Sequence, residues 1–197
     1  MSLAAAPTER PRLVLVLMLD QFRQEYMVRY RAQFVPGGFR YLLERGAVFA
    51  NCNYPYTSTL TAPGHAVIAT GAYPNAHGVI GNEWFDRASG RETKADRDVN
   101  EKLVGTPPDS PGASPHWLIG STLADELRLA TTGRSRAIGI SPKGRSAILM
   151  VGKSANAAYW FDNATLHAIS STFYMKELPG WVRRFNAQDW AAKYASK

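Results

Sequence analysis

The sequence predicts an α/β fold in which helices cover both faces of a doubly wound, mostly parallel sheet. Two observations predict it: residues 13–19 are continuously apolar, and amphipathic stretches alternate with further short apolar runs. A continuous apolar run is typical of a strand that is buried on both faces of a parallel sheet. With 197 residues, 45% of them hydrophobic, the chain can bury a sizeable core.

The first third of the chain predicts alternating strands and helices. Apolar runs indicate strands, apolar residues three or four apart indicate helices, and glycine marks helix ends. Proline suits the first turn of a helix, as at Pro63. In order, we expect a strand at 13–19, a helix at 22–34, a helix at 39–45 ended by Gly46, a strand at 47–52, a polar loop at 54–60, and a short helix from Pro63 to Gly71.

The remaining two thirds begin with a polar segment. Residues 86–116 are rich in Pro, Ser, Asp and Gly, so we expect an excursion over the surface and not a domain boundary. We treat residues 1–11 as a leader or tag and 12–197 as one domain. After the excursion we expect an amphipathic helix at 119–130 ended by Gly133, strands at 137–140, 147–151 and 157–161, a turn at 162–163, and mostly helix at 178–197, broken near Asn186.

Candidate site residues follow several of these strands. In a doubly wound sheet the ligand site lies at the carboxyl ends of the strands, where Asp20, Thr61, Lys143 and Arg145 are expected. Asp20 could bind a metal through its carboxylate or could cap the next helix. Lys143 and Arg145 could hold phosphate oxygens or could belong to a solvated surface.

Thr61 stands at the start of a helix, where free N–H groups and the positive end of the helix dipole favour a bound phosphate. A zinc-bound hydroxyl could ionise and act as a nucleophile, but a threonine at this place can also be a plain helix cap. Asn82 could donate its amide to a phosphate oxygen, although Gly-Asn is also a turn signal. His65 and His77 could bind zinc, but hydrogen bonding within the fold is the commoner role.

Composition excludes several classes of function. The net charge of +7 suits an anionic partner, but the basic residues are scattered in twos, so we expect no nucleic-acid binding. The single Cys52 excludes an internal disulfide and a cysteine-based zinc cluster. No apolar stretch approaches the roughly 20 residues that span a bilayer, so we expect no membrane insertion. We expect a monomer.

Five segments, in one order, carry a family resemblance. They are Asp20-Gln21 after the first strand, Thr61-Ala-Pro-Gly-His65, His77-Gly-Val-Ile-Gly-Asn82, Gly139-Ile-Ser-Pro-Lys-Gly-Arg145 and Ala157-Ala-Tyr-Trp-Phe-Asp162. Together they resemble the phosphate-irrepressible alkaline phosphatases of Gram-negative bacteria, within the type I phosphodiesterase/nucleotide pyrophosphatase superfamily. The segments cover nearly the whole chain.

The resemblance implies a phosphomonoester hydrolase with two Zn²⁺ ions and a small-molecule phosphate monoester as substrate. It implies that Asp20 binds one zinc, that Thr61 is both nucleophile and ligand of that zinc, and that Asn82, Lys143 and Arg145 contact the phosphate. It also implies a periplasmic or secreted protein. In such enzymes the remaining zinc ligands lie beyond Lys197, so the fold is expected to be incomplete at its C-terminus and the 197-residue chain alone to be inactive.

Three other functions stay open. A phosphodiesterase or nucleotide pyrophosphatase would share the threonine and the metal site, but the cations Lys143 and Arg145 suit a dianionic monoester better. A sulfatase would carry a modifiable cysteine or serine in place of Thr61, and an arginine in place of His65. A non-catalytic anion-binding module would explain the length and the basic charge.

Overall fold

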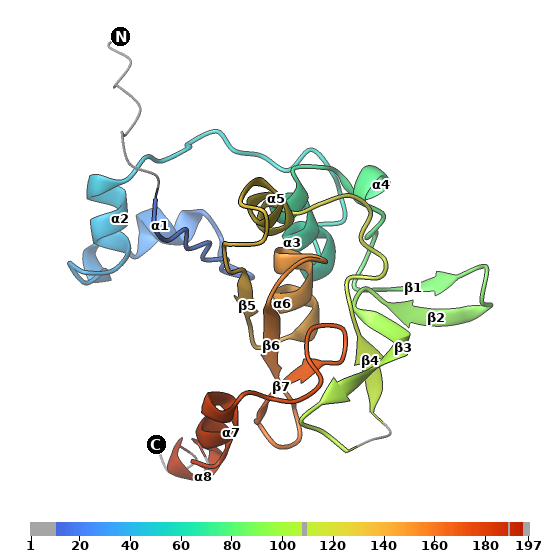
Figure 1. Cartoon of the computed structure of the whole chain (residues 1–197). Coiled ribbons are helices and arrows are strands. Elements are labelled where there is room, and N and C mark those ends of the chain that lie inside the picture. The colour runs from blue at the N-terminus through green and yellow to red at the C-terminus, as the bar shows by residue number, and fades with distance from the viewer. Residues whose placement is uncertain (1–10, 108–109, 189, 195–197) are drawn as a thin grey trace. The chain divides into compact units, whose positions relative to one another are not determined.

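The computed structural model describes residues 11–107, 110–188 and 190–194, and it divides the chain into two compact units, Met1–Cys52 and Asn53–Lys197 (Figure 1). Each unit is described by itself. Most of the leader or tag expected at 1–11 lies outside the described residues. Within the described part, no helix combines the length and the apolar character needed to cross a bilayer.

The first unit contains three short helices. They are α1 (Glu25–Arg29), the 3₁₀ helix η1 (Arg31–Gln33) and α2 (Phe39–Arg45). The helix expected at 22–34 is thus two shorter helices, whereas the one expected at 39–45 is confirmed. Aromatic rings hold the unit together, since Phe39 stacks on Phe22 at 5.2 Å between ring centroids and packs against Phe34 at 5.0 Å.

The strands predicted at 13–19 and 47–52 are wrong for this structure. Both segments are irregular, and side chains of the first are exposed, with Leu13 at 80% of its surface. A strand exists only when its backbone groups pair with a neighbouring strand. Among residues 11–52 no strand is formed, so the apolar run, although strand-like in sequence, has no partner within its unit.

The second unit is built on a five-stranded sheet in the order β4-β3-β7-β6-β5, with β1 and β2 forming a separate two-stranded sheet. β5 and β6 are parallel, and the other pairings in the five-stranded sheet are antiparallel, so these strands form a mixed sheet where a mostly parallel one was expected. The strands are β1 (Glu83–Asp86), β2 (Arg91–Lys94), β3 (Arg97–Val104), β4 (Pro111–Ala113), β5 (Ile138–Ile140), β6 (Ala157–Phe161) and β7 (Ala168–Ser171).

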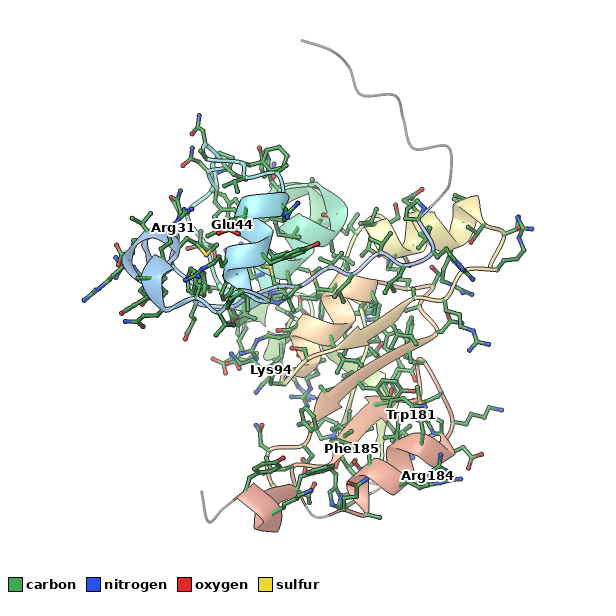
Figure 2. The ribbon with its side chains drawn as sticks, turned by 90° about the vertical axis from the view of Figure 1, so that its left-hand side faces the viewer. Arg31, Glu44, Lys94, Trp181, Arg184 and Phe185 are labelled. Atoms are coloured by element: carbon green, nitrogen blue, oxygen red, sulfur yellow. The ribbon has the colours of Figure 1, made fainter. Side chains whose placement is uncertain are left out.

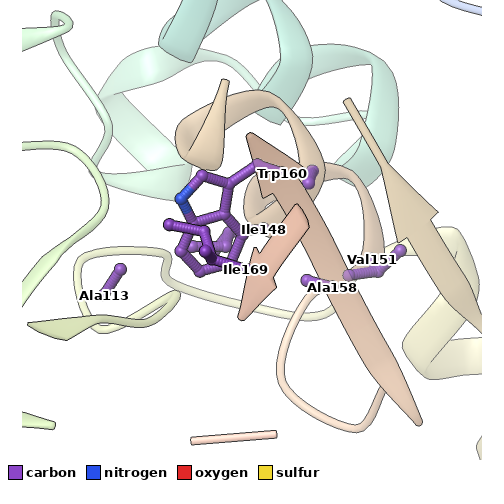
Figure 3. Close-up of a cluster of buried hydrophobic side chains, with 7 residues drawn as sticks. Ala113, Ile148, Val151, Ala158, Trp160 and Ile169 are labelled. Atoms are coloured by element: carbon purple, nitrogen blue, oxygen red, sulfur yellow. The ribbon is translucent and has the colours of Figure 1, made fainter. Parts of the chain in front are cut away.

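Helices cover both faces of this sheet, as predicted. Along β6, Ala158 and Trp160 face the helix α6 (Gly144–Val151), and Figure 3 shows Trp160 beside Ile148 of α6 and Ile169 of β7. The alternate residues of β6 pack on the helix α7 (Gly180–Asn186), whose Trp181 and Phe185 are labelled in Figure 2. Tyr159 of β6 meets Trp181 at 5.3 Å between ring centroids. The other helices are α3 (Thr61–Thr70), α4 (Pro74–His77), α5 (Leu123–Ala130) and α8 (Trp190–Tyr194).

Two predictions in this unit differ from the structure. Residues 147–151, predicted as a strand, belong to α6, because that helix is buried on two sides: Ile148 faces the sheet, and Leu149 packs against Ala62 of α3. A helix buried on two sides has a continuous apolar run and cannot be told from a strand by periodicity. The segment at 86–116, expected as a surface excursion, contains β2, β3 and β4 and adds two strands to the sheet.

Helix α5 is fixed at its start by a capping box. The Thr122 side chain accepts from the backbone N–H of Asp125 at 3.1 Å, and the Asp125 carboxylate accepts from the N–H of Thr122 at 3.0 Å. The same carboxylate accepts from the N–H and hydroxyl of Ser154, both at 2.7 Å. Burial alone would raise the pKa of Asp125, but the hydrogen bonds outweigh it, and the pKa is lowered.

We expect Asp125→Asn to lower the free energy of unfolding by about 1–3 kcal/mol at pH 7, because charged acceptors are lost. A lowered folded-state pKa means that this contribution is complete above the unfolded value, ~3.9, and is lost as pH falls through the folded value. Denaturant unfolding at pH 7 and pH 3 checks this: the gap between wild type and variant should shrink at pH 3. Glu126→Gln, on the exposed side of α5, is the control and should change little. A gap that does not depend on pH would contradict the assignment.

Candidate active site

The first turn of α3 carries Thr61. The helix begins at Thr61, two residues earlier than the Pro63 start expected from sequence, and ends at Gly71, whose φ of 68° is the left-handed cap conformation. Ala62, Pro63 and Ala66 bury the inner side of this helix against the core. Thr61 itself is half-buried, so its backbone is held by packing while the residue still has solvent access.

Asn82 joins this turn through its side chain. Its Oδ1 accepts a hydrogen bond from the backbone N–H of Ala62 at 2.8 Å, and its backbone carbonyl accepts from the N–H of Ala95 at 3.0 Å. A backbone N–H can only donate, so the amide oxygen must face the helix and the NH₂ group remains as a donor. The structure thereby places Asn82, expected as a phosphate-contacting residue, beside the residue that follows Thr61.

Lys143 and Arg145 lie at the amino end of α6. Lys143 is the N-cap residue, and Arg145 is in the first turn, directly after β5 and its following loop. Arg145 is half-buried, and its Nε is a buried atom without a hydrogen-bond partner among the described residues. A buried guanidinium nitrogen without a partner is costly, and a bound anion is one group that could complete it.

The acid Asp96, just after β2, links the two helix ends, and sequence analysis did not single it out. Asp96 follows Ala95, which is bonded to Asn82, and its carboxylate lies against the first turn of α6, where a Cβ atom added at Gly144 would lie 2.8 Å from Asp96 Oδ2. Burial raises the pKa of Asp96, while the charges of Arg145 and Lys94 oppose that rise. Lys94, marked in Figure 2, also pairs with Glu83 at 3.2 Å in an exposed ion pair.

These links place the amino ends of α3 and α6 near each other. Hydrogen bonds run from Ala62 to Asn82 and from Asn82 to Ala95, and the next residue, Asp96, packs its carboxylate against Gly144 in the first turn of α6. The two helices also pack on each other through Leu149, Ala62 and Ala66. Two helix amino ends and a half-buried arginine supply positive charge and N–H donors, which is a combination that could hold an anion such as phosphate.

The other expected site residues lie elsewhere or bond within the fold. Asp20 is exposed in the first unit, so its expected approach to Thr61 stays a prediction. His65 donates from Nδ1 to the carbonyl of Thr61 at 2.7 Å. His77 is fully buried, and its Nδ1 accepts from the N–H of Val79 at 3.1 Å, with burial lowering the pKa of the ring.

A zinc site is only partly supplied by these residues. A carboxylate and a hydroxyl, as in Asp20 and Thr61, are donor types that zinc accepts. Among the described residues, however, no group of three or more His, Cys, Asp or Glu side chains is arranged to hold a metal ion. Asp20 and Thr61 are too few for a tetrahedral site by themselves.

Known proteins match this chain over most of its length. The family model of the type I phosphodiesterases/nucleotide pyrophosphatases matches residues 14–195. Alkaline phosphatase PhoV of Synechococcus elongatus is 46% identical over 185 residues, which are 94% of this chain and 34% of PhoV. Alkaline phosphatase PafA of Elizabethkingia meningoseptica is 42% identical over 178 residues, 90% of this chain and 33% of PafA. The chain spans about a third of the length of these relatives.

Solved structures of PafA agree with the fold. The crystal structure of wild-type PafA aligns with a TM-score of 0.87 at 39% identity, over 90% of this chain and 34% of that one. A second solved structure is of a PafA variant in which a threonine is replaced by serine, and an asparagine, a lysine and an arginine by alanine. This similarity confirms the predicted alkaline phosphatase-like α/β fold and its partial coverage.

Proposed function

Because the chain belongs to the type I phosphodiesterase/nucleotide pyrophosphatase family, we propose that the protein is a zinc-dependent phosphomonoester hydrolase that forms a phosphothreonine intermediate at Thr61. One observation carries the proposal: hydrogen bonds connect the first turn of α3, which bears Thr61, to Asn82 and Ala95, and the neighbouring Asp96 packs against the first turn of α6, which bears Arg145. The names of PhoV and PafA, both alkaline phosphatases, support the reaction class.

The four substituted positions of the PafA variant support the choice of residues. They have the residue types of Thr61, Asn82, Lys143 and Arg145, in the same order. The threonine and asparagine of PafA are separated by the same number of residues as Thr61 and Asn82, and the lysine and arginine by the same number as Lys143 and Arg145. We therefore assign phosphate contact to Asn82, Lys143 and Arg145.

In the proposed reaction the Thr61 hydroxyl gives its proton to solvent, its Oγ forms a bond to phosphorus, and the bond from phosphorus to the ester oxygen breaks, so that the alcohol leaves after taking a proton from solvent. Water then hydrolyses the phosphothreonine and releases inorganic phosphate. The NH₂ group of Asn82, the ammonium of Lys143 and the guanidinium of Arg145 donate to the non-bridging oxygens. Fixed donors of this kind stabilise the charge of the transferring group, because they need no reorganisation during the reaction.

Zinc, when bound, would lower the pKa of the attacking hydroxyl and would stabilise the leaving oxygen. Of the described residues, Asp20 and Thr61 would contribute to one of two zinc sites, and the further ligands would have to come from elsewhere in the complete enzyme. By complete enzyme we mean the protein at the full length that its gene encodes.

The similarity to the alkaline phosphatases also suggests a substrate class, a location and an oligomeric state. We propose a small-molecule phosphate monoester as substrate, a periplasmic or secreted location, and a monomer that does not bind nucleic acid. Residues 12–197 would be the N-terminal part of one alkaline phosphatase-like domain. A phosphodiesterase or nucleotide pyrophosphatase is the second candidate, because the matched family model includes those activities by name.

Hydrolysis of 4-nitrophenyl phosphate and of its bis-ester by the complete enzyme separates the two candidates. We expect a higher kcat/KM for the monoester, because its dianion matches two cations better than a monoanionic diester does. Activity should fall on removal of metal by a chelator and return with added Zn²⁺. The 197-residue chain alone should show negligible turnover with Zn²⁺ added. A preference for the bis-ester would favour the phosphodiesterase, and robust turnover by the 197-residue chain would refute the need for further ligands.

A further inference from the structure

Asp96 lies against the first turn of α6 and has no role in the proposed reaction. Its carboxylate lies against the backbone of this turn, and the charge of Arg145 acts on it. A Cβ atom added at Gly144 would lie 2.8 Å from Asp96 Oδ2 and 3.2 Å from the ring of Trp160. The carboxylate is therefore packed against a glycine that leaves just enough room for it.

We propose that Asp96 is a positioning residue, which holds Arg145 in place relative to Asn82 and Thr61. The inference rests on the proposed function, because it gives Asp96 a part in phosphate binding only if Arg145 contacts phosphate. Asp96 itself touches neither the substrate nor the reacting atoms in this assignment. It acts through the backbone of the α6 turn.

Helix α6 has no side-chain cap at its amino end. The N-cap residue is Lys143, whose side chain has donors but no acceptor and makes no cap hydrogen bond. A helix start needs an acceptor for its first N–H groups. Asp96 places a carboxylate oxygen against this turn from a distant part of the chain, where it can accept from these N–H groups.

Backbone hydrogen bonds hold Asp96 and its neighbour in place. Its backbone carbonyl accepts from the N–H of Ser114 at 3.0 Å, and its neighbour Ala95 donates to the carbonyl of Asn82 at 3.0 Å. Asn82 in turn bonds to Ala62 beside Thr61. Asp96 thus occupies the one junction in this path where the α3 side of the site meets the α6 side.

The negative charge of Asp96 does not favour phosphate binding. A carboxylate close to a phosphate site repels the substrate, so attraction of phosphate does not explain an acid at this position. A geometric role does explain it, because a misplacement of about 1 Å in a catalytic contact can cost about a hundredfold in rate. The acceptor oxygen of Asp96, and not its charge, is then the required feature.

The test is a double-mutant cycle in the complete enzyme with Asp96→Ala and Arg145→Ala. We expect Asp96→Ala to lower kcat/KM for 4-nitrophenyl phosphate by about tenfold and to raise the inhibition constant of inorganic phosphate similarly. In the Arg145→Ala background most of that loss should disappear. Asp96→Asn keeps an acceptor oxygen without the charge and should stay within about threefold of wild type.

Two further variants separate positioning from loss of folding. Gly144→Ala pushes the same carboxylate away from the other side, and we expect a loss in the same direction as for Asp96→Ala. Asp98→Asn is the control: Asp98 is a buried acid on β3 that accepts from Ser114 at 2.6 Å. It should lower thermal stability and leave the inhibition constant of phosphate unchanged.

The outcomes distinguish the inference from the proposed function. An Asp96→Ala loss that persists in full without Arg145 would overturn the positioning role and leave the proposed function standing. An Asp96→Asn loss as large as that of Asp96→Ala would overturn it as well, because charge would then matter. If Arg145→Ala alone left monoester turnover and phosphate inhibition unchanged, the phosphate site of the proposed function would fail, and the positioning role with it.

Discussion

Replacement of Thr61 by alanine is expected to lower kcat for phosphate monoesters by at least about a thousandfold in the complete enzyme. The reason is that no other group would take the place of the attacking oxygen, and loss of a nucleophile is among the largest single losses seen in enzymes. Because Ala also occupies the first turn of a helix well, α3 should still form. Steady-state hydrolysis of 4-nitrophenyl phosphate, with metal content measured on the same samples, checks the result.

Two control variants and a measurement of zinc content test this prediction further. Thr61→Ser keeps a hydroxyl and should retain activity within about a hundredfold of wild type. Thr59→Ala removes an exposed threonine from the same loop and should leave turnover unchanged. Zinc content should stay largely intact in Thr61→Ala, since other ligands hold the ions. Turnover that survives in Thr61→Ala would remove the nucleophile assignment and favour a non-catalytic anion-binding role.

Local signals predicted the second unit well wherever one residue type decides the backbone. Gly71 ends α3 in the left-handed conformation, and the run at β6 was predicted with its observed bounds, Ala157–Phe161. The helical C-terminal segment broken near Asn186 is also confirmed by α7 and α8. In each case the decisive information is a cap, a turn or an apolar run a few residues long.

The predictions from sequence failed where contacts with residues far along the chain determine the secondary structure. The run at 147–151 is apolar because α6 is buried between the sheet and α3, and a strand would look the same. The strand β7 (Ala168–Ser171) was not predicted, because it is only four residues long and partly polar. It forms through pairing with β3 and β6. Both errors have one cause, because burial on two sides depends on neighbours far along the chain.

The candidate site divides in the same way. Thr61, Asn82, Lys143 and Arg145 were found by resemblance, with Thr61 also expected at a helix start and the two cations after a predicted strand, and their roles stay predictions. Asp96 offered no signal, because a single acid in a polar segment resembles any surface residue. Its position follows only from the structure, in which Ala95 donates to the carbonyl of Asn82 and the Asp96 carboxylate packs beside Gly144, next to Arg145. A residue that acts through another residue's backbone leaves no motif.

Removal of both cations, Lys143→Ala with Arg145→Ala, should change the substrate preference of the complete enzyme. Each charge-assisted contact contributes about 1.5–3 kcal/mol, so we expect kcat/KM for 4-nitrophenyl phosphate to fall by at least about a hundredfold. The bis-ester presents one negative charge and fewer free oxygens, and its kcat/KM should fall by less than about tenfold. The ratio of the two kcat/KM values, measured in parallel, reports the change.

A matched pair of arginines tests whether the effect is local. Arg134→Ala with Arg136→Ala also removes two positive charges two residues apart, from exposed positions shortly before β5. Because scattered surface charge only steers anions weakly at physiological salt, this control should keep the wild-type ratio. Equal losses for both esters in the Lys143 and Arg145 variant would mean that the cations do not select the dianion. The preference for monoesters would then have to arise elsewhere in the complete enzyme.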